Sequence, residues 1–198
     1  MINLPEQALI PVLTTMKQLE KFLATSLKVC ILQDFHFNLL KDVVKILHDN
    51  ERIGLVHIEM IQGISNDEYG TQILTQQLKV DGIISSKPKI IEMAKKTHAL
   101  SVQRVFLIDS KSLERGVASV GDSKPDAMEV MPALTFQMFK NIKERIDMEL
   151  WAGGLIRDEE TVRIVLANGA KRMTVGNLDL CVKMNHLLAK ERGHEALK

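Results

Sequence analysis

The chain has 198 residues and a mass of 22.3 kDa, enough for one good-sized domain or at most two small ones. Hydrophobic residues make up 45% and charged residues 26%, which is typical of a folded soluble protein and excludes a disordered or collagen-like chain. Lys and Arg number 26 and Asp and Glu number 25, giving a net charge of +1. This balance argues against a grossly basic nucleic-acid binder, although it leaves room for a local basic patch.

No apolar run approaches the roughly 18 residues of a membrane span, and the N-terminus lacks the basic and apolar stretches of a secretory signal. We therefore expect a cytoplasmic protein without membrane contact. Cys30 and Cys181 are the only cysteines, and each lies in an apolar segment. Buried free thiols are the expected state in a reducing cytosol, with a disulfide as the weaker alternative. Two cysteines are too few for a cysteine-type zinc site.

Short apolar runs rich in β-branched residues alternate with longer segments that have apolar residues at helical spacing. Eight such runs are predicted as strands, over residues 8–13, 28–33, 53–58, 80–84, 100–105, 127–131, 148–152 and 172–174. Their centres lie roughly 20–28 residues apart, which is the length of a strand–helix pair with short loops.

The segments between these runs are predicted to be amphipathic helices. Apolar residues that share a helix face are Met16, Leu19, Leu23 and Leu27, then Leu40, Val43 and Leu47, and later Phe136, Phe139, Ile142 and Ile146. Asp67 is expected to start the third helix, Pro88 suits the first turn of the fourth, and Asp158 and Gly169 are expected to cap and end the seventh.

Eight strand–helix pairs predict either an open doubly wound sheet or a closed barrel. An open sheet usually has a glycine-rich first turn, which Pro11-Val-Leu-Thr-Thr-Met does not provide. Eight is also the number of parallel strands that closes into such a barrel. We therefore predict a single compact TIM-type (β/α)8 barrel that spans residues 1–198 as one domain.

In such a barrel the functional side chains come from the C-terminal ends of the strands and the loops that follow them. The end of the fifth strand is ambiguous, because an end near Val105 places Arg104 at the mouth whereas an end near Ile108 places Asp109 there. The polar candidates at these ends are Asp34, His57, Glu59, Lys87, Arg104 and Glu129.

Glycines at the ends of the last two strands predict a phosphate site. Gly153 and Gly154 allow the backbone to approach a ligand, and Thr174, Gly176 and Asn177 lead into the N-terminus of the last helix. Free amides and the positive end of the helix dipole meet there, and phosphate-binding barrels commonly use these two loops. A plain turn is the alternative for Gly153 and Gly154 alone.

The charged candidates are weaker evidence. A lone His57 is more often a hydrogen-bonded structural residue than a catalyst. Glu129 lies in an apolar run and needs a partner if it is buried, for which Arg104 or Lys87 are candidates. A purely structural ion pair across the mouth is an equally good interpretation. No nucleophile–base pair is evident, and no catalytic residue, metal or cofactor is predicted.

Several blocks in order resemble the glycerol-3-phosphate-responsive antiterminator family of bacteria, from about Ile10 to Leu180. The main blocks are Asp34-Phe-His-Phe, the run from His57 to Gly70, Asp81-Gly-Ile-Ile-Ser-Ser-Lys, Gln103-Arg-Val-Phe-Leu-Ile-Asp-Ser, Pro125-Asp-Ala-Met-Glu-Val-Met-Pro and Ala152-Gly-Gly-Leu-Ile. The resemblance implies a phosphate-binding barrel that binds glycerol 3-phosphate and acts on the leader mRNA of glycerol-utilisation genes to prevent early termination of transcription.

This chain departs from the family pattern at several positions. Glu59 stands where the family usually has Asp, and Ala133 stands where it has Gly after Pro132. Thr174-Val-Gly-Asn replaces Thr-Thr-Ser-Asn, which removes two hydroxyl donors and keeps every backbone amide.

The rival hypothesis is an enzyme that acts on a small phosphorylated metabolite, such as an aldolase with Lys87 as its Schiff-base lysine. A third hypothesis is a barrel that has lost its chemistry and only associates with itself, and a homo-oligomer is compatible with the sequence. Candidate RNA-binding clusters are Lys87, Lys89, Lys95, Lys96 and His98, and then Lys190, Arg192, His194 and Lys198. A solvated helix face is the more common role of such clusters.

Overall fold

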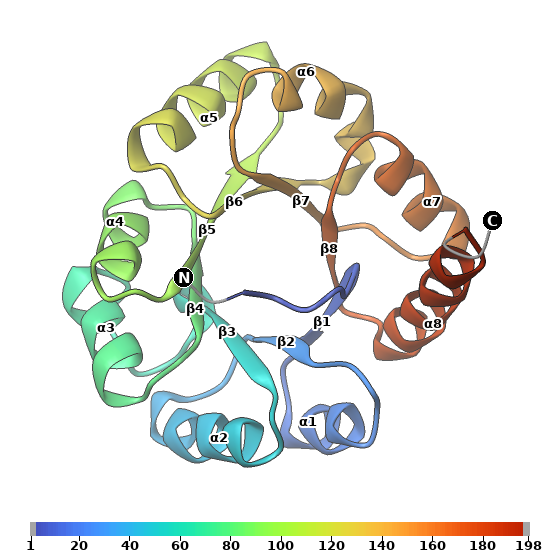
Figure 1. Cartoon of the computed structure of the whole chain (residues 1–198). Coiled ribbons are helices and arrows are strands. Elements are labelled where there is room, and N and C mark those ends of the chain that lie inside the picture. Colours follow the sequence, from blue (N-terminus) through green and yellow to red (C-terminus); the bar gives the residue numbers. More distant parts are fainter. Residues whose placement is uncertain (1–2, 196–198) are drawn as a thin grey trace.

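The structure is a computed structural model that describes residues 3–195. Its strands are all parallel, pair in sequence order and close into a barrel, around which the helices form an outer ring (Figure 1). The strands are β1 (Leu9–Leu13), β2 (Val29–Leu32), β3 (Ile53–His57), β4 (Gly82–Ser85), β5 (Leu100–Phe106), β6 (Ala127–Met131), β7 (Glu149–Gly153) and β8 (Arg172–Val175). The predicted TIM-type (β/α)8 fold is confirmed, and the predicted strand ends differ from these bounds by at most two residues.

The helices are α1 (Met16–Leu23), α2 (Phe37–Asp49), α3 (Glu68–Gln72), α4 (Pro88–Lys96), α5 (Ser110–Ser123), α6 (Phe139–Lys143), α7 (Glu159–Ala167) and α8 (Leu178–Glu195). Shorter helical turns are η1 (Ile58–Met60), η2 (Ile73–Gln77) and η3 (Ala133–Met138). None of the helices within residues 3–195 is long and apolar enough to cross a membrane. The assignment of residues 1–198 to one domain stays a prediction, because both ends lie outside the described residues.

The helix ends follow the sequence rules. Asp67 and Asp158 cap α3 and α7 by accepting hydrogen bonds from the backbone N–H groups of Gly70 and Thr161, both at 2.8 Å. Pro88 is the first residue of α4, and Gly169, with φ of 106°, follows the end of α7. These predicted helix ends are confirmed. The two Asp side chains satisfy N–H groups that a helix start leaves open, and Pro88 has no N–H that would need a partner there.

Two predicted helices are shorter than the apolar pattern suggests. Leu27 lies beyond the end of α1, and Ile146 lies beyond the end of α6. Phe136 belongs to η3, where Thr135 leaves helical conformation and its hydroxyl donates to the carbonyl of Pro132 at 2.9 Å. A side chain that bonds locally to the backbone in this way competes with a continuous helix.

Two cores hold the barrel together. The larger core lies between strands and helices and includes Cys30 and Cys181, which are buried free thiols as predicted. The smaller core fills the barrel interior, where every second residue of a strand points inward. It is built from Ile10, Val29, Ile31, Leu55, Ile84, Leu100, Val102, Ala127 and Trp151.

The N-terminal segment closes the end of the barrel opposite the mouth. Arg172, the first residue of β8, donates to the backbone carbonyls of Pro5 and Gln7, each at 2.8 Å. The Gln7 side chain in turn donates to the carbonyl of Val29 at 2.8 Å and accepts from the N–H of Val29 at 3.0 Å. The first described residues are therefore tied to β2 and β8 and form a plug under the inner core.

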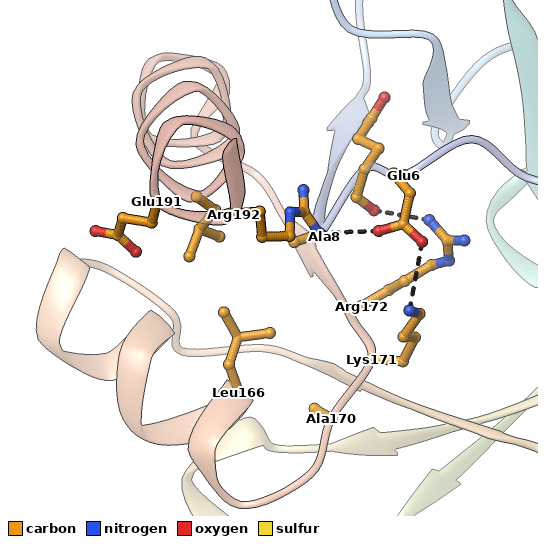
Figure 2. A pocket seen from close by; sticks show the side chains of 10 residues that line it. Glu6, Ala8, Leu166, Ala170, Lys171, Arg172, Glu191 and Arg192 are labelled. Atoms are coloured by element: carbon orange, nitrogen blue, oxygen red, sulfur yellow. Dashed lines mark hydrogen bonds and ion pairs between the residues drawn. The ribbon is translucent and has the colours of Figure 1, made fainter. Parts of the chain in front are cut away.

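Beside this plug lies a hollow of about 270 Å³ between α7, α8 and the N-terminal segment (Figure 2). Its charged groups are engaged with one another. Glu6 pairs with Arg192 at 2.9 Å and with Lys171 at 3.5 Å. The hollow is therefore a seam between neighbouring elements, at the far end of the barrel from the predicted site.

Two glycines of α5 give a matched test of this packing. A Cβ at Gly116 would overlap a methyl group of Val105 in β5, whereas a Cβ at Gly121 would meet nothing within 4 Å. Gly121→Ala is expected to stabilise the protein by about 0.5–1 kcal/mol through helix propensity. Gly116→Ala is expected to destabilise it by about 1–3 kcal/mol through overpacking. Urea unfolding measures both, and equal effects of the two substitutions would contradict this account of the α5–β5 contact.

Candidate functional site

Above the apolar inner core, the same inward-facing positions carry polar side chains. His57, Arg104, Glu129 and Thr174 continue the inward alternation of β3, β5, β6 and β8 toward the strand ends. Their exposed fractions are 7%, 9%, 0% and 5%. A polar layer therefore closes the barrel interior just below the mouth, at the face where barrel sites are built.

Glu129 is the most deeply buried member of this layer. One of its carboxylate oxygens accepts from Nε of Arg104 at 2.6 Å, and the other accepts from the hydroxyl of Thr174 at 2.5 Å. Arg104 and Lys87 were the possible partners of this carboxylate from the sequence, and in the structure the partner is Arg104. A short charge-assisted bond to each oxygen is what a buried carboxylate requires.

The end of β5 settles the register that the sequence left open. The strand ends at Phe106, so Arg104 points into the mouth, whereas Asp109 lies in the following loop and caps α5. Gln103 faces the other way and donates to Ser119 of α5 at 2.7 Å.

His57 joins the Arg104 pair to a second carboxylate. Nη1 of Arg104 lies 3.1 Å from Nδ1 of His57, and Nε2 of His57 lies 3.4 Å from Oε2 of Glu59. Burial and the adjacent Arg104 cation lower the pKa of His57 to about 4, so the imidazole is neutral near pH 7. A neutral ring that accepts from Arg104 at Nδ1 carries its proton on Nε2, facing Glu59.

Glu59 is held by the end of β4. Its Oε1 accepts from the hydroxyl of Ser85 at 2.7 Å, and from the N–H and hydroxyl of Ser86 at 2.8 Å and 3.1 Å. Burial raises the pKa of Glu59, but these hydrogen bonds outweigh burial and the pKa is lowered overall. Its Oε2 is buried, and apart from Nε2 of His57 at 3.4 Å it has no polar partner among the described residues.

The glycine loops lie beside this network. A Cβ on Gly153 would overlap the Thr174 hydroxyl and lie 2.8 Å from Oε1 of Glu129, so glycine is required there by packing alone. Gly154 has φ of 77°, which a turn explains. Gly176 is different because it is exposed and a Cβ there would meet nothing within 4 Å. Asn177 directly precedes α8, and its side chain accepts from the N–H of Leu180 at 3.1 Å.

The remaining two candidates lie at the edge of the mouth. Asp34 is exposed in the loop after β2, where its N–H donates to the carbonyl of Met60 at 2.9 Å and its charge acts on His57. Lys87 is exposed at the start of α4, and its ammonium donates to the carbonyl of Asn66 at 2.9 Å and to the side chain of Asn66 at 2.5 Å. Lys87 is therefore outside the buried network.

Sequence reasoning missed two contributors to this arrangement. Ser85 places its hydroxyl between Glu59 and the N–H of Lys87, the latter at 3.0 Å. Its position at the end of a strand was the available signal. Asn66 had no such signal, because its role depends on a lysine that follows another strand. Within residues 3–195, no group of three or more His, Cys, Asp or Glu side chains could hold a metal ion.

Comparison with known proteins decides the family. The model of the family described as glycerol-3-phosphate responsive antiterminator matches residues 9–181. The chain belongs to this family. The resemblance found in the sequence blocks is thereby confirmed.

Individual relatives agree with this assignment. The chain is similar to a glycerol uptake operon antiterminator regulatory protein from Listeria monocytogenes str. 4b F2365, with 31% identity and a TM-score of 0.85 over 89% of this chain and 95% of that one. An antiterminator-related protein from Thermotoga maritima MSB8 gives 25% identity and a TM-score of 0.78, over 89% and 99% of the two chains. The uncharacterised protein YgcP of Escherichia coli (strain K12) is 28% identical over 149 residues, which is 75% of this chain and 78% of that protein.

The barrel is also similar in fold to an aldolase. Deoxyribose phosphate aldolase from Aeropyrum pernix gives a TM-score of 0.69 at 12% identity, over 90% of this chain and 89% of that one. At that identity the likeness shows the shared barrel alone.

The lowered pKa of His57 predicts a pH dependence of stability. An unfolded chain takes up this proton near pH 6.5, whereas the folded chain takes it up near pH 4. The stability that comes from keeping His57 neutral should be fully present above pH 6.5. As the pH falls from 6.5 to 4, the free energy of unfolding should decrease by at most about 1.4 kcal/mol per pH unit. His57→Gln should flatten that slope, and His186→Gln, at an exposed histidine, should not. Urea unfolding measured across this pH range tests this prediction. Parallel curves of unfolding free energy against pH for wild type and His57→Gln would contradict it.

The buried ion pair predicts that stability lost by removing one charge is recovered by removing the other. Arg104→Met should cost about 3–5 kcal/mol, because it leaves the Glu129 carboxylate buried without its cation. Adding Glu129→Leu should recover a large part of this loss, because the charge that needed a partner is gone. Urea unfolding of wild type, both single variants and the double variant measures the coupling. A double variant whose loss equals the sum of the single losses would show that the two charges do not depend on one another.

Proposed function

We propose that the protein is a glycerol-3-phosphate-sensing regulator that binds leader mRNA of glycerol-utilisation genes in the cytosol and prevents early termination of transcription. Membership of the antiterminator family over residues 9–181 supports this proposal. The observation that carries the ligand half is the open N-terminus of α8 at the barrel mouth, beside a layer of polar side chains.

The phosphate is proposed to bind at the loop from Thr174 to Asn177. The first N–H groups of a helix lack intrahelical partners and lie at the positive end of its dipole. Asn177 occupies the N–H of Leu180, which leaves the preceding amides for a ligand. Gly176 offers open space above them. Because amides supply these contacts, the absence of the family's hydroxyl at Val175 is compatible with binding.

The charges of the mouth support a phosphate at this edge and the glycerol end over the centre. The central layer has carboxylates at Glu129 and Glu59 against the single cation of Arg104, with a neutral His57, and Asp34 adds a negative charge at its edge. A phosphate is repelled from that centre. Oε2 of Glu59, whose polar partner among the described residues is Nε2 of His57 at 3.4 Å, is proposed to accept from a hydroxyl group, which is what glycerol 3-phosphate has at its other end.

The aldolase hypothesis has no such support. A Schiff-base lysine needs a dry pocket that lowers its pKa, and Lys87 is exposed and bound to Asn66. We therefore propose a binding protein without catalytic residues.

Ligand and RNA are proposed to be coupled through the mouth. A continuous series of contacts joins β8 to the loop before α3. It runs through Thr174, Glu129, Arg104, His57, Glu59, Ser86, Lys87 and Asn66. A ligand that binds one arrangement of this series better than another would shift the surface beyond it.

Glycerol 3-phosphate, and not glycerol, is expected to stabilise the protein. At a concentration of about 100 times Kd the gain is about 2.7 kcal/mol, equivalent to a rise in Tm of about 5–10 °C for a chain of this size. Thermal unfolding with millimolar ligand measures it, with glycerol and inorganic phosphate as controls. An unchanged Tm with glycerol 3-phosphate would refute ligand binding.

The position of the phosphate is tested by Gly176→Asp. The new carboxylate lies where the phosphate is proposed, so the thermal shift should fall to less than half, while the Tm without ligand stays within about 2 °C of wild type because this position is open. Gly193→Asp makes the same charge change at an equally open position near the far end of α8 and should keep the full shift. A full thermal shift in both variants would show that the phosphate binds at another position.

RNA affinity is expected to depend on the ligand. A coupling of about 1–3 kcal/mol corresponds to a roughly 5- to 150-fold change, and RNA should change ligand affinity by the same factor. Fluorescence titration of the leader transcript of the same genome's glycerol-uptake genes, with and without saturating glycerol 3-phosphate, measures it. Arg104→Ala should reduce the coupling. If wild type binds RNA with the same affinity with and without glycerol 3-phosphate, the regulatory half of the proposal is refuted.

A further inference from the structure

The exposed apolar side chains of the protein gather on one face. Every large hydrophobic residue that is exposed in the described part of the chain lies at a strand end, in the loop that follows, or in the first helical turns after it, which is the mouth face. They are Met16, Leu39, Met60, Tyr69, Phe106, Ile108, Leu134, Met138 and Leu155. A monomer that exposed apolar residues at random would scatter them over both ends of the barrel, so this face is built for contact.

Both exposed aromatic residues flank the same short stretch of this face. Tyr69, 78% exposed, follows β3 and lies in α3, whereas Phe106, 51% exposed, ends β5. Between them β4 leads to Lys87 and Lys89 at the start of α4, since β3, β4 and β5 are neighbours in the barrel (Figure 1). We call Tyr69, Lys87, Lys89 and Phe106 the β3–β5 rim.

Lys87 and Lys89 are the two cations of this rim, and both side chains are exposed. Lys87 donates to Asn66, which is neutral, and Lys89 has no ion pair among residues 3–195. The neighbouring carboxylates Asp67 and Asp109 keep their negative charge, but each is turned to the helix that it caps. They accept from the N–H groups of Gly70 and Ser112 at 2.8 Å and 2.7 Å. Glu68, beside Tyr69 in the first turn of α3, is a third carboxylate next to the rim.

The other basic clusters found in the sequence lack this combination. Lys95 and Lys96 lie in the last turn of α4, at the opposite end of the helix from Lys89, and Lys95 is bound to the carbonyl of Lys124. Arg192 of α8 is paired with Glu6, and Lys198 lies outside the described residues. Neither cluster has an exposed aromatic residue beside it among the described side chains.

We propose that the β3–β5 rim is the surface that binds single-stranded RNA, with bases stacked on Tyr69 and Phe106 and phosphates next to Lys87 and Lys89. Exposed aromatic rings separated by cations are the usual platform for unpaired nucleotides. This inference rests on the proposed function and adds the surface to it. Lys87 already joins the rim to the loop before α3 and, through Ser86 and Glu59, to the polar layer below the mouth.

The stacking test uses Tyr69→Leu with Phe106→Leu in the full chain. Leucine keeps an apolar surface and removes the ring, so an aliphatic protein contact would tolerate it and a stacked base would not. Affinity for the labelled leader transcript should fall at least tenfold, since stacking contributes about 1–3 kcal/mol per base. The Tm and its rise with glycerol 3-phosphate should match wild type, because both side chains are exposed.

Two lysines of α4 provide a matched test of the proposed phosphate contact. Lys89→Ala should weaken RNA binding and reduce the slope of log affinity against log salt by about 1, and Lys96→Ala should do neither. A transcript that contains 4-thiouridine should, on irradiation, crosslink to the peptides that carry Tyr69 or Phe106.

The outcomes separate the surface from the function. Wild-type RNA affinity in the double leucine variant, or crosslinks confined to the end of α8, would overturn the rim and leave the regulator standing. No binding of the transcript by wild type at low salt would overturn both. Unchanged RNA affinity together with loss of an oligomer in sedimentation would assign this face to a second copy of the chain, and that also overturns the proposal.

Discussion

The arrangement of the barrel mouth depends on one constraint, the burial of the Glu129 carboxylate inside a ring of parallel strands. A buried charge must be paired and hydrogen-bonded, and this requirement explains Arg104 on one oxygen and Thr174 on the other. It also explains Gly153, because a side chain there would displace both the carboxylate and the hydroxyl. Burial, together with the cation that neutralises Glu129, then keeps His57 neutral, and the centre of the mouth has an excess of negative charge.

The fold could be predicted from the sequence because its information is local. Short apolar runs rich in β-branched residues located the strands of the described residues. Asp67 and Asp158 marked helix starts by accepting from nearby N–H groups, and Pro88 did so because it has no N–H that would need a partner. The errors also have local causes. Phe136 carried the right spacing for a long sixth helix, but the Thr135 hydroxyl bonds to the backbone and a short turn forms in its place.

The site could be predicted only as a set of residues. Sequence position placed His57, Arg104 and Glu129 at strand ends, because the period of a strand fixes which residues face inward. It could not decide which of Arg104 or Lys87 meets Glu129, since that depends on the tilt and register of separate strands. Nor could it separate Gly153, required by packing, from Gly176, which has open space above it.

Closure of the barrel by its first and last strands has a consequence for synthesis on the ribosome. Leu9 pairs with Met173, and Arg172 holds the carbonyl of Gln7, which lies 165 residues earlier in the chain. Until β8 leaves the ribosome, β1 and β7 are open sheet edges with unpaired backbone groups, the kind of edge that pairs with other chains. A nascent or truncated chain that stops before residue 172 therefore carries two aggregation-prone edges, and both disappear together when this one strand is inserted.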